Sequence, residues 1–200
     1  TLADLNGLGV ISYQWLRAGA VITSATLPSY VLTQADVNKT VSVMASYTDG
    51  LGKLESVSSL ASALVANLND LPTGSVVMSG TSATQGQILT VSNTLADLDG
   101  LGAISYQWLR GGAVITGATK STYTLGQSDV GKAISVKASY TDVLGTTESV
   151  SSAVSTPVVN VNDLPTGGVL ITGSTVQGQT LTASNTLADL DGIGAVSYQW

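Results

Sequence analysis

The 200-residue sequence carries 13 acidic and seven basic side chains, a formal net charge of −6, and neither cysteine nor histidine. Nucleic acids and anionic membranes are bound by basic patches, so this charge argues against both as partners. Without cysteine the chain has no disulfide framework and no thiolate metal site. Mean hydropathy is +0.33, yet no apolar run approaches the ~18 residues of a membrane-spanning helix. Abundant Ser, Thr and Val instead predict a soluble all-β protein.

One motif occurs three times along the chain. Residues 94–108 read TLADLDGLGAISYQW, and residues 1–15 and 186–200 differ from it at only a few positions. The tryptophans that end the copies, Trp15, Trp108 and Trp200, are separated by 93 and 92 residues. A repeat of this length matches one β-sandwich domain rather than a short solenoid unit.

The Pro- and Gly-containing stretches 66–74 and 159–167 are the expected linkers. They divide the chain into an incomplete repeat, 1–70, which lacks its first strands, a complete repeat, 71–163, and the first strands of another, 164–200. We therefore expect a segment of a longer tandem array. Joining two chains through their incomplete ends would leave a redundant strand, because residues 186–200 duplicate residues 1–15.

Within the complete repeat, the expected strands follow in chain order at 75–78, 88–95, 103–110, 113–118, 121–125, within 128–142, and at 147–158. The sixth alternates Ile134, Val136, Ala138 and Tyr140 with Ser135, Lys137 and Ser139, the pattern of a half-buried strand. Ile104, Tyr106 and Trp108 share one face of the third. Seven short strands in a repeat of this size predict an immunoglobulin-like β-sandwich with Trp108 in its core.

Three motifs recur in the repeats: Y-Q-W-L-R, S-x-Y-x-L followed by D-V-G, and S-Y-T-D. Through these motifs, and over essentially its whole length, the sequence resembles the bacterial immunoglobulin-like repeats of giant surface adhesins, including RTX-type adhesins. The resemblance implies an extended stalk of many sandwiches, calcium at the junctions between them, and separate domains for ligand binding. The nonapeptide G-G-x-G-x-D repeats of RTX tails are absent from the sequence, so the resemblance concerns the stalk.

The acidic residues recur at fixed positions of the repeat. They are concentrated in particular loops and are not spread over the whole surface. Asp36 and Asp129 precede a turn, and we favour a role in holding that turn over a role in metal binding. For Glu55 and Glu148, a structural role and a metal-binding role both stay open. The remaining acids, with the linker asparagines, form the candidate calcium ligands. They are Asp4, Asp49, Asn67, Asn69, Asp70, Asp97, Asp99, Asp142, Asn160, Asn162, Asp163, Asp189 and Asp191.

An immunoglobulin-like topology would gather the opening loop, the last hairpin and the linker at one end of the sandwich. Calcium takes six to eight oxygen ligands, and Asp-x-Asp-Gly supplies two carboxylates beside a glycine turn. The N-x-N-D linker resembles that of cadherins. The alternative is that these residues only form Asx turns, and Asn6 replaces an aspartate in the first copy.

Catalysis is not expected, because without His or Cys the candidate bases and nucleophiles reduce to carboxylates, Lys and Ser. The predicted function is a structural stalk of a large bacterial cell-surface adhesin, extracellular and braced by calcium, whose partners are adjacent repeats of the same chain. The alternative is the repeating subunit of an extracellular filament, sheath or surface layer with lateral contacts through exposed edge strands.

Overall fold

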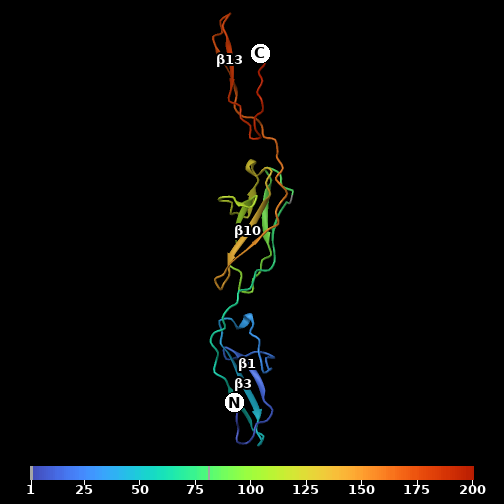
Figure 1. The fold of residues 1–200 in the computed structure, drawn as a ribbon, viewed down its shortest axis with the longest axis vertical. Helices are drawn as coiled ribbons and strands as arrows, with labels where there is room; N and C mark the ends of the chain where they lie inside the picture. Colours follow the sequence, from blue (N-terminus) through green and yellow to red (C-terminus); the bar gives the residue numbers. More distant parts are fainter. Residues whose placement is uncertain (1, 81) are drawn as a thin grey trace. The chain divides into compact units, whose positions relative to one another are not determined.

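The computed structural model describes residues 2–80 and 82–200, and it is all-β, as expected (Figure 1). Two short 3-10 helices are the helical elements of this part of the chain, and neither is long enough to cross a membrane. The chain divides into two compact units. The first comprises Thr1–Leu71, Asp97–Gly100 and Asp142–Thr146; the second comprises Pro72–Ala96, Leu101–Thr141 and Thr147–Trp200.

The first unit contains one antiparallel sheet with the strand order β2-β1-β3-β4. Its strands are β1 (Ser12–Arg17), β2 (Ala20–Val21), β3 (Val41–Thr48) and β4 (Leu54–Ser58), and the helix η1 (Gln34–Asp36) precedes β3. Ala18 and Gly19 join β1 to β2 with positive φ angles at both positions. Such a two-residue turn has the twist that an antiparallel hairpin needs.

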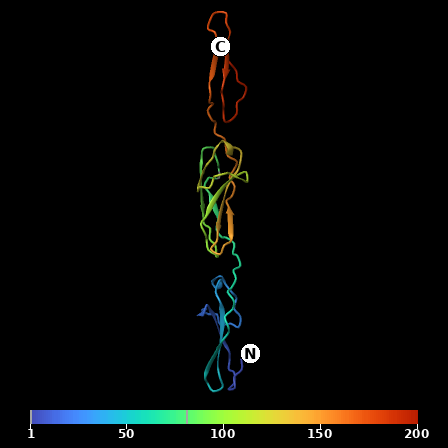
Figure 2. The same ribbon diagram turned by 90° about the vertical axis from the view of Figure 1, so that its left-hand side faces the viewer.

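The second unit repeats this sheet as β8-β7-β10-β11 and adds a second sheet, β5-β6-β9 (Figure 2). The elements are β5 (Val76–Met78), β6 (Ile88–Asn93), β7 (Ser105–Arg110), β8 (Ala113–Val114), β9 (Thr122–Thr124), η2 (Gln127–Asp129), β10 (Ile134–Thr141) and β11 (Thr147–Ser151). A two-stranded sheet follows, formed by β12 (Val169–Gly173) and β13 (Leu181–Asn185). The antiparallel sheets are consistent with a β-sandwich.

Trp108 is the largest fully buried side chain in the core of the second unit. Its ring stacks on Tyr123 with 5.6 Å between centroids, and its indole Nε1 donates to the Lys120 carbonyl at 2.8 Å. The expected alternation in β10 is confirmed, because all four predicted inward residues are buried. The core comprises Val76, Met78, Ala83, Leu89, Val91, Leu95, Trp108, Leu125, Ile134, Val136, Ala138, Tyr140 and Val158.

The last predicted strand, 147–158, is regular only as far as Ser151. Beyond it, the hydroxyls of Ser152 and Ser155 accept hydrogen bonds from the backbone N–H groups of Val136 and Ile134, at 3.1 and 2.9 Å. Because side-chain hydroxyls accept from these two backbone donors, the segment follows β10 without forming a regular ladder.

Two tryptophans at equivalent positions of the repeat differ in burial, and this difference predicts different contributions to stability. Trp108→Ala should lower the free energy of unfolding of the second unit by about 3–5 kcal/mol, because it empties the core. Trp200→Ala should change it by no more than about 0.5 kcal/mol, since Trp200 is 74% exposed. Urea unfolding followed by circular dichroism measures both, and equal losses would contradict this assignment of the core.

Candidate functional site

The Asp-x-Asp-Gly loop of the second repeat is a tight turn closed by its own first aspartate. Asp97 Oδ1 accepts the Asp99 N–H at 2.8 Å, and the Asp97 carbonyl accepts the Gly100 N–H at 3.2 Å. Gly100 has φ +93°, which an L side chain rarely adopts. The turn therefore fixes where the next carboxylate, that of Asp99, lies.

The Asp99 carboxylate is buried within the first unit and receives hydrogen bonds on both oxygens. Gln34 Nε2 donates to Oδ1 at 2.6 Å, and the Asp70 N–H donates to Oδ2 at 2.8 Å. The hydrogen bond from the Asp70 backbone, which outweighs desolvation, and those from Asn67 and Gln34 lower the pKa of Asp99. We call Asp99, Gln34, Asn67 and Asp70 a loop–linker cluster.

The same cluster recurs in the second unit around Asp191. The Asp163 N–H donates to Asp191 Oδ2 at 2.8 Å, and Asn160 Nδ2 and Gln127 Nε2 donate to Oδ1 at 2.9 and 3.2 Å. Its turn is again closed by the preceding acid, Asp189, whose Oδ1 accepts the Asp191 N–H at 2.8 Å. The Asp163 backbone hydrogen bond is the largest cause of the lowered pKa of Asp191. The arrangement therefore belongs to the repeat.

Other candidate ligands hold local turns instead. Asp142 Oδ1 accepts the N–H groups of Leu144 and Thr146, both at 2.8 Å. Asp49 does the same in the first repeat with Leu51 and Lys53, at 3.0 and 2.7 Å.

Asp4 and the linker residues also have hydrogen-bond partners. Asp4 accepts the Asn6 N–H at 2.7 Å and the Tyr47 hydroxyl at 2.9 Å. Its hydrogen bond raises the pKa of Tyr47. Asn69 and Asn162 each donate to the carbonyl of the aspartate that follows, and Asp163 Oδ2 accepts Gln85 Nε2 at 3.0 Å.

These residues offer a calcium ion only part of an oxygen shell. Within residues 2–80 and 82–200, no three acidic side chains come together closely enough to hold a metal ion. Two buried oxygens of the first unit, Asn67 Oδ1 and Asp142 Oδ2, have no hydrogen-bond partner among the described residues. Because a carboxylate oxygen has two lone pairs, Asp99 could also accept a cation beside its present donors. Asn67, Asp99 and Asp142 are thus the candidate ligands that fit best.

A second carboxylate in each repeat is buried in a network that the sequence did not reveal. Arg17 Nε donates to Asp36 Oδ1 at 2.7 Å, while the Tyr30 hydroxyl and the Thr33 N–H donate to Oδ2 at 3.0 and 2.7 Å. Burial raises the pKa of Asp36, but these hydrogen bonds outweigh it and lower the pKa to about 2. Asp36 therefore caps η1 and holds its turn, the role favoured from the sequence.

The second repeat contains the same network. Arg110 Nε and the Tyr123 hydroxyl donate to Asp129 at 2.6 and 3.0 Å, and the Gly126 N–H donates at 2.7 Å. Arg, Tyr and Asp have the same spacing in both repeats, and that recurrence is the sequence signal that could have identified the network.

No protein-family model and no curated protein matches this sequence.

The Asp36 network predicts a loss of stability in acid. The unfolded carboxyl has a pKa of 3.8 and the folded one about 2. Because the folded pKa is depressed, the contribution is present above about pH 4 and is lost as the pH falls toward 2. Asp36→Asn should remove this pH dependence from the first repeat. Amide resonances of β3, followed through thermal melts at each pH, measure it, with Glu55→Gln as the control. An Asp36→Asn protein with the wild-type pH profile would contradict the assignment.

Proposed function

We propose that this chain is a non-catalytic structural segment, the stalk or extender, of a large bacterial cell-surface adhesin built from tandem immunoglobulin-like repeats. The observation that carries the proposal is the recurrence of the loop–linker cluster around Asp99 and Asp191. Each cluster joins the opening loop of one repeat to the linker and the 3-10 helix of the preceding repeat. The position of each cluster therefore follows from the order of the repeats along the chain.

The chemistry of this cluster suits a mechanical role. The Asp99 carboxylate receives one backbone donor from the linker and one side-chain donor from η1. Hydrogen bonds to an ionised acceptor are stronger than neutral ones, and burial reduces competition from water. One carboxylate thereby restrains both the linker and the loop. Repetition along an array would limit flexing at every junction, which a projecting stalk requires.

Calcium is the proposed brace of the junction. Asn67, Asp99 and Asp142 would hold it, since the first and last have buried oxygens without protein partners. A bound dication would offset the negative charge of Asp99 and Asp142 at this junction. Calcium tolerates irregular shells of carboxylate, amide and backbone oxygens, which suits a site of mixed side chains.

The full 200-residue chain tests this proposal through its thermal melting midpoint and scattering profile, in millimolar calcium and then in chelator. Ligand at ~100-fold above its dissociation constant should stabilise the folded state by about 2.7 kcal/mol. We expect calcium to raise the midpoint and extend the scattering envelope. Asp99→Asn should abolish the calcium effect.

Glu55→Gln is the matched control, because its ion pair with Lys53 lies on the surface, where such pairs contribute little. It should respond to calcium as the wild type does. A wild-type midpoint and envelope unchanged by calcium would overturn the calcium brace and leave the hydrogen-bonded cluster as the only restraint.

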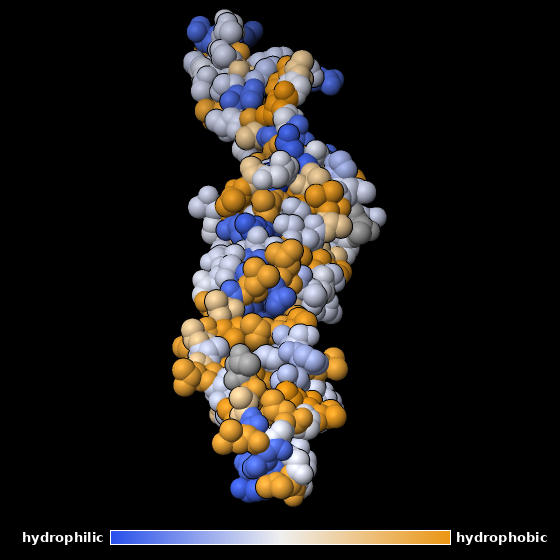
Figure 3. All heavy atoms as spheres, turned by 60° about the horizontal axis from the view of Figure 1, so that its bottom comes forward, coloured by the Kyte–Doolittle hydropathy of each residue, from blue (hydrophilic) through white to orange (hydrophobic). Residues whose placement is uncertain are grey.

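The filament or surface-layer function is the second candidate. It is favoured by apolar side chains on the surface, some of which Figure 3 shows in orange. Val169, Leu170 and Ile171 of β12 are all exposed. Ordered lateral assemblies of the chain, seen by electron microscopy, would favour this candidate over the stalk.

A further inference from the structure

The opening loop of the first repeat differs from its two equivalents in one charged position. Asn6 stands where the other copies of the loop have Asp99 and Asp191. Gly7 follows it, as a glycine follows each of those aspartates. Asn6-Gly7 is the only Asn-Gly pair in the sequence, and it therefore falls at the position whose carboxylate restrains the linker in the other two copies.

Asn6 lies in the same turn as those aspartates. Asp4 Oδ1 accepts the Asn6 N–H at 2.7 Å, as Asp97 Oδ1 accepts the Asp99 N–H at 2.8 Å. The Gly7 N–H donates to the Asp4 carbonyl at 3.2 Å. Gly7 has φ +92°, and the equivalent glycine of the second repeat has φ +93°. The turn is therefore the same whether its middle residue carries an amide or a carboxylate.

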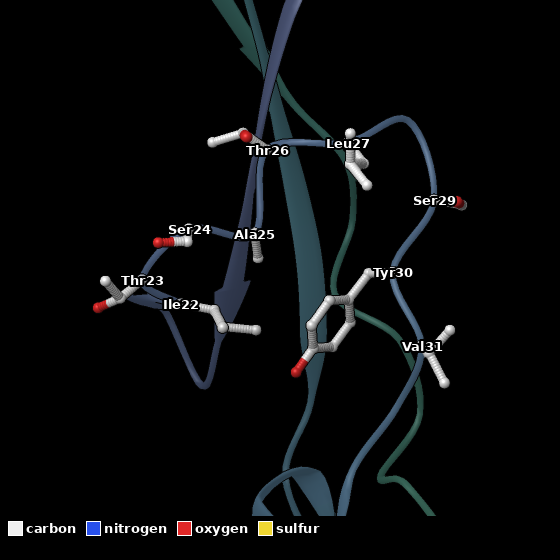
Figure 4. A pocket seen from close by; sticks show the side chains of 9 residues that line it. All are labelled: Ile22, Thr23, Ser24, Ala25, Thr26, Leu27, Ser29, Tyr30 and Val31. Atoms are coloured by element: carbon white, nitrogen blue, oxygen red, sulfur yellow. The ribbon is translucent and has the colours of Figure 1, made fainter.

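Other loops of the first repeat also keep their backbone where the residue type changes. Ser24 has φ 63° in the loop that Figure 4 shows, and its equivalent, Gly117, has φ 76°. Asn38 has φ 57°, where the second repeat has Gly131 with φ 72°. An aspartate in place of Asn6 should likewise leave the loop unchanged.

The Asn6 amide is open to attack by the backbone nitrogen that follows it. Asn6 and Gly7 are both exposed, and within residues 2–80 and 82–200 the Asn6 side chain has no hydrogen-bond partner. A Cβ placed on Gly7 would meet no atom within 4 Å, so the surroundings of its nitrogen are uncrowded. Glycine also has no side chain that could hinder the attack.

We propose that Asn6 is a site of spontaneous deamidation, and that the aspartate formed gives the first repeat the Asp-x-Asp-Gly loop of the other copies. The Gly7 nitrogen, once it has lost its proton, attacks Asn6 Cγ. The new C–N bond closes a succinimide ring, and ammonia leaves from Cγ. Water then opens the ring, at the bond to Cγ to give aspartate or at the bond to the backbone carbonyl carbon to give isoaspartate. The reaction consumes water, releases ammonia and needs no oxidant or reductant.

The aspartyl product has its carboxylate where Asp99 and Asp191 have theirs. Those carboxylates accept the N–H groups of Asp70 and Asp163, both at 2.8 Å. A carboxylate accepts such a hydrogen bond more strongly than a neutral amide does. Within the tandem array of the proposed function, deamidation therefore supplies a linker acceptor that the first repeat does not encode. That consequence rests on the proposed function, whereas the reaction depends neither on the adhesin assignment nor on calcium.

Peptide mass mapping of the full chain, incubated at mildly alkaline pH, tests the reaction. Trypsin cleaves after Arg17 and Lys39, so Asn6 lies in peptide 1–17 and Asn38 in peptide 18–39. We expect peptide 1–17 to gain about 1 Da with time, because an amide becomes a carboxyl group. The gain should be slower at mildly acidic pH, since the Gly7 nitrogen must lose its proton before it attacks.

Asn38 is the internal control, because it is also exposed but is followed by Lys39, whose side chain hinders the nitrogen. It should deamidate at least about tenfold more slowly than Asn6. Asn6→Gln is the matched variant. Its side chain has to close a larger ring, so peptide 1–17 should gain no mass in the same time. Asn6→Asp should give the same peptide as the aspartyl product and should melt as the fresh wild type does.

Three results would overturn the inference. Asn6 that stays unchanged in the folded chain contradicts it, and deamidation in urea alone would show that the turn protects the amide. Equal rates at Asn6 and Asn38 would show that Gly7 does not direct the reaction. Isoaspartate as the sole product, identified by electron-transfer fragmentation, would show that the new carboxylate is not placed as in Asp99. The calcium and scattering experiments are unaffected by any of these results, so failure here is distinct from failure of the proposed function.

Discussion

A β-sheet with one apolar face must have that face covered, and this constraint governs the whole chain. In residues 71–163 the two sheets cover each other, and Trp108 lies fully buried between them. The equivalent positions Met78 in β5 and Ile171 in β12 differ, because Met78 is 8% exposed and Ile171 is 59% exposed. Burial thus depends on which strands pack on a face and not only on the residues of the strand itself.

The second constraint concerns where charge is placed. Most of the acidic groups described above serve as acceptors for N–H donors: Asp36 caps η1, Asp142 closes a hairpin and Asp99 restrains the linker. A carboxylate that accepts several such bonds is stabilised in its ionised form, as the lowered pKa values of Asp36 and Asp99 indicate. The acids therefore organise the loops of the repeat, and any metal site would be built upon loops already fixed by hydrogen bonds.

Local pattern predicted the strands and the core well, because alternation in β10 directly reflects which face is buried. It could not predict that Gln34 donates to Asp99, since the two residues lie 65 positions apart and glutamine carries no distinctive signal. Nor could it show that Asp142 serves its own hairpin, because the same Asp-containing turn is compatible with metal binding. The Arg17–Tyr30–Asp36 network was accessible in principle, through the identical spacing of Arg110, Tyr123 and Asp129.

The junction depends on a loop carboxylate, Asp99, that restrains the linker of the preceding repeat. Hydrogen exchange at the Asp70 amide, measured by NMR on the full chain, tests this most directly, because that amide donates to Asp99 Oδ2. We predict that this amide exchanges much more slowly than in an unfolded peptide. In Asp99→Ala it should return to fast exchange while the β10 amides stay protected. Exchange at the unfolded rate in the wild-type chain would contradict it.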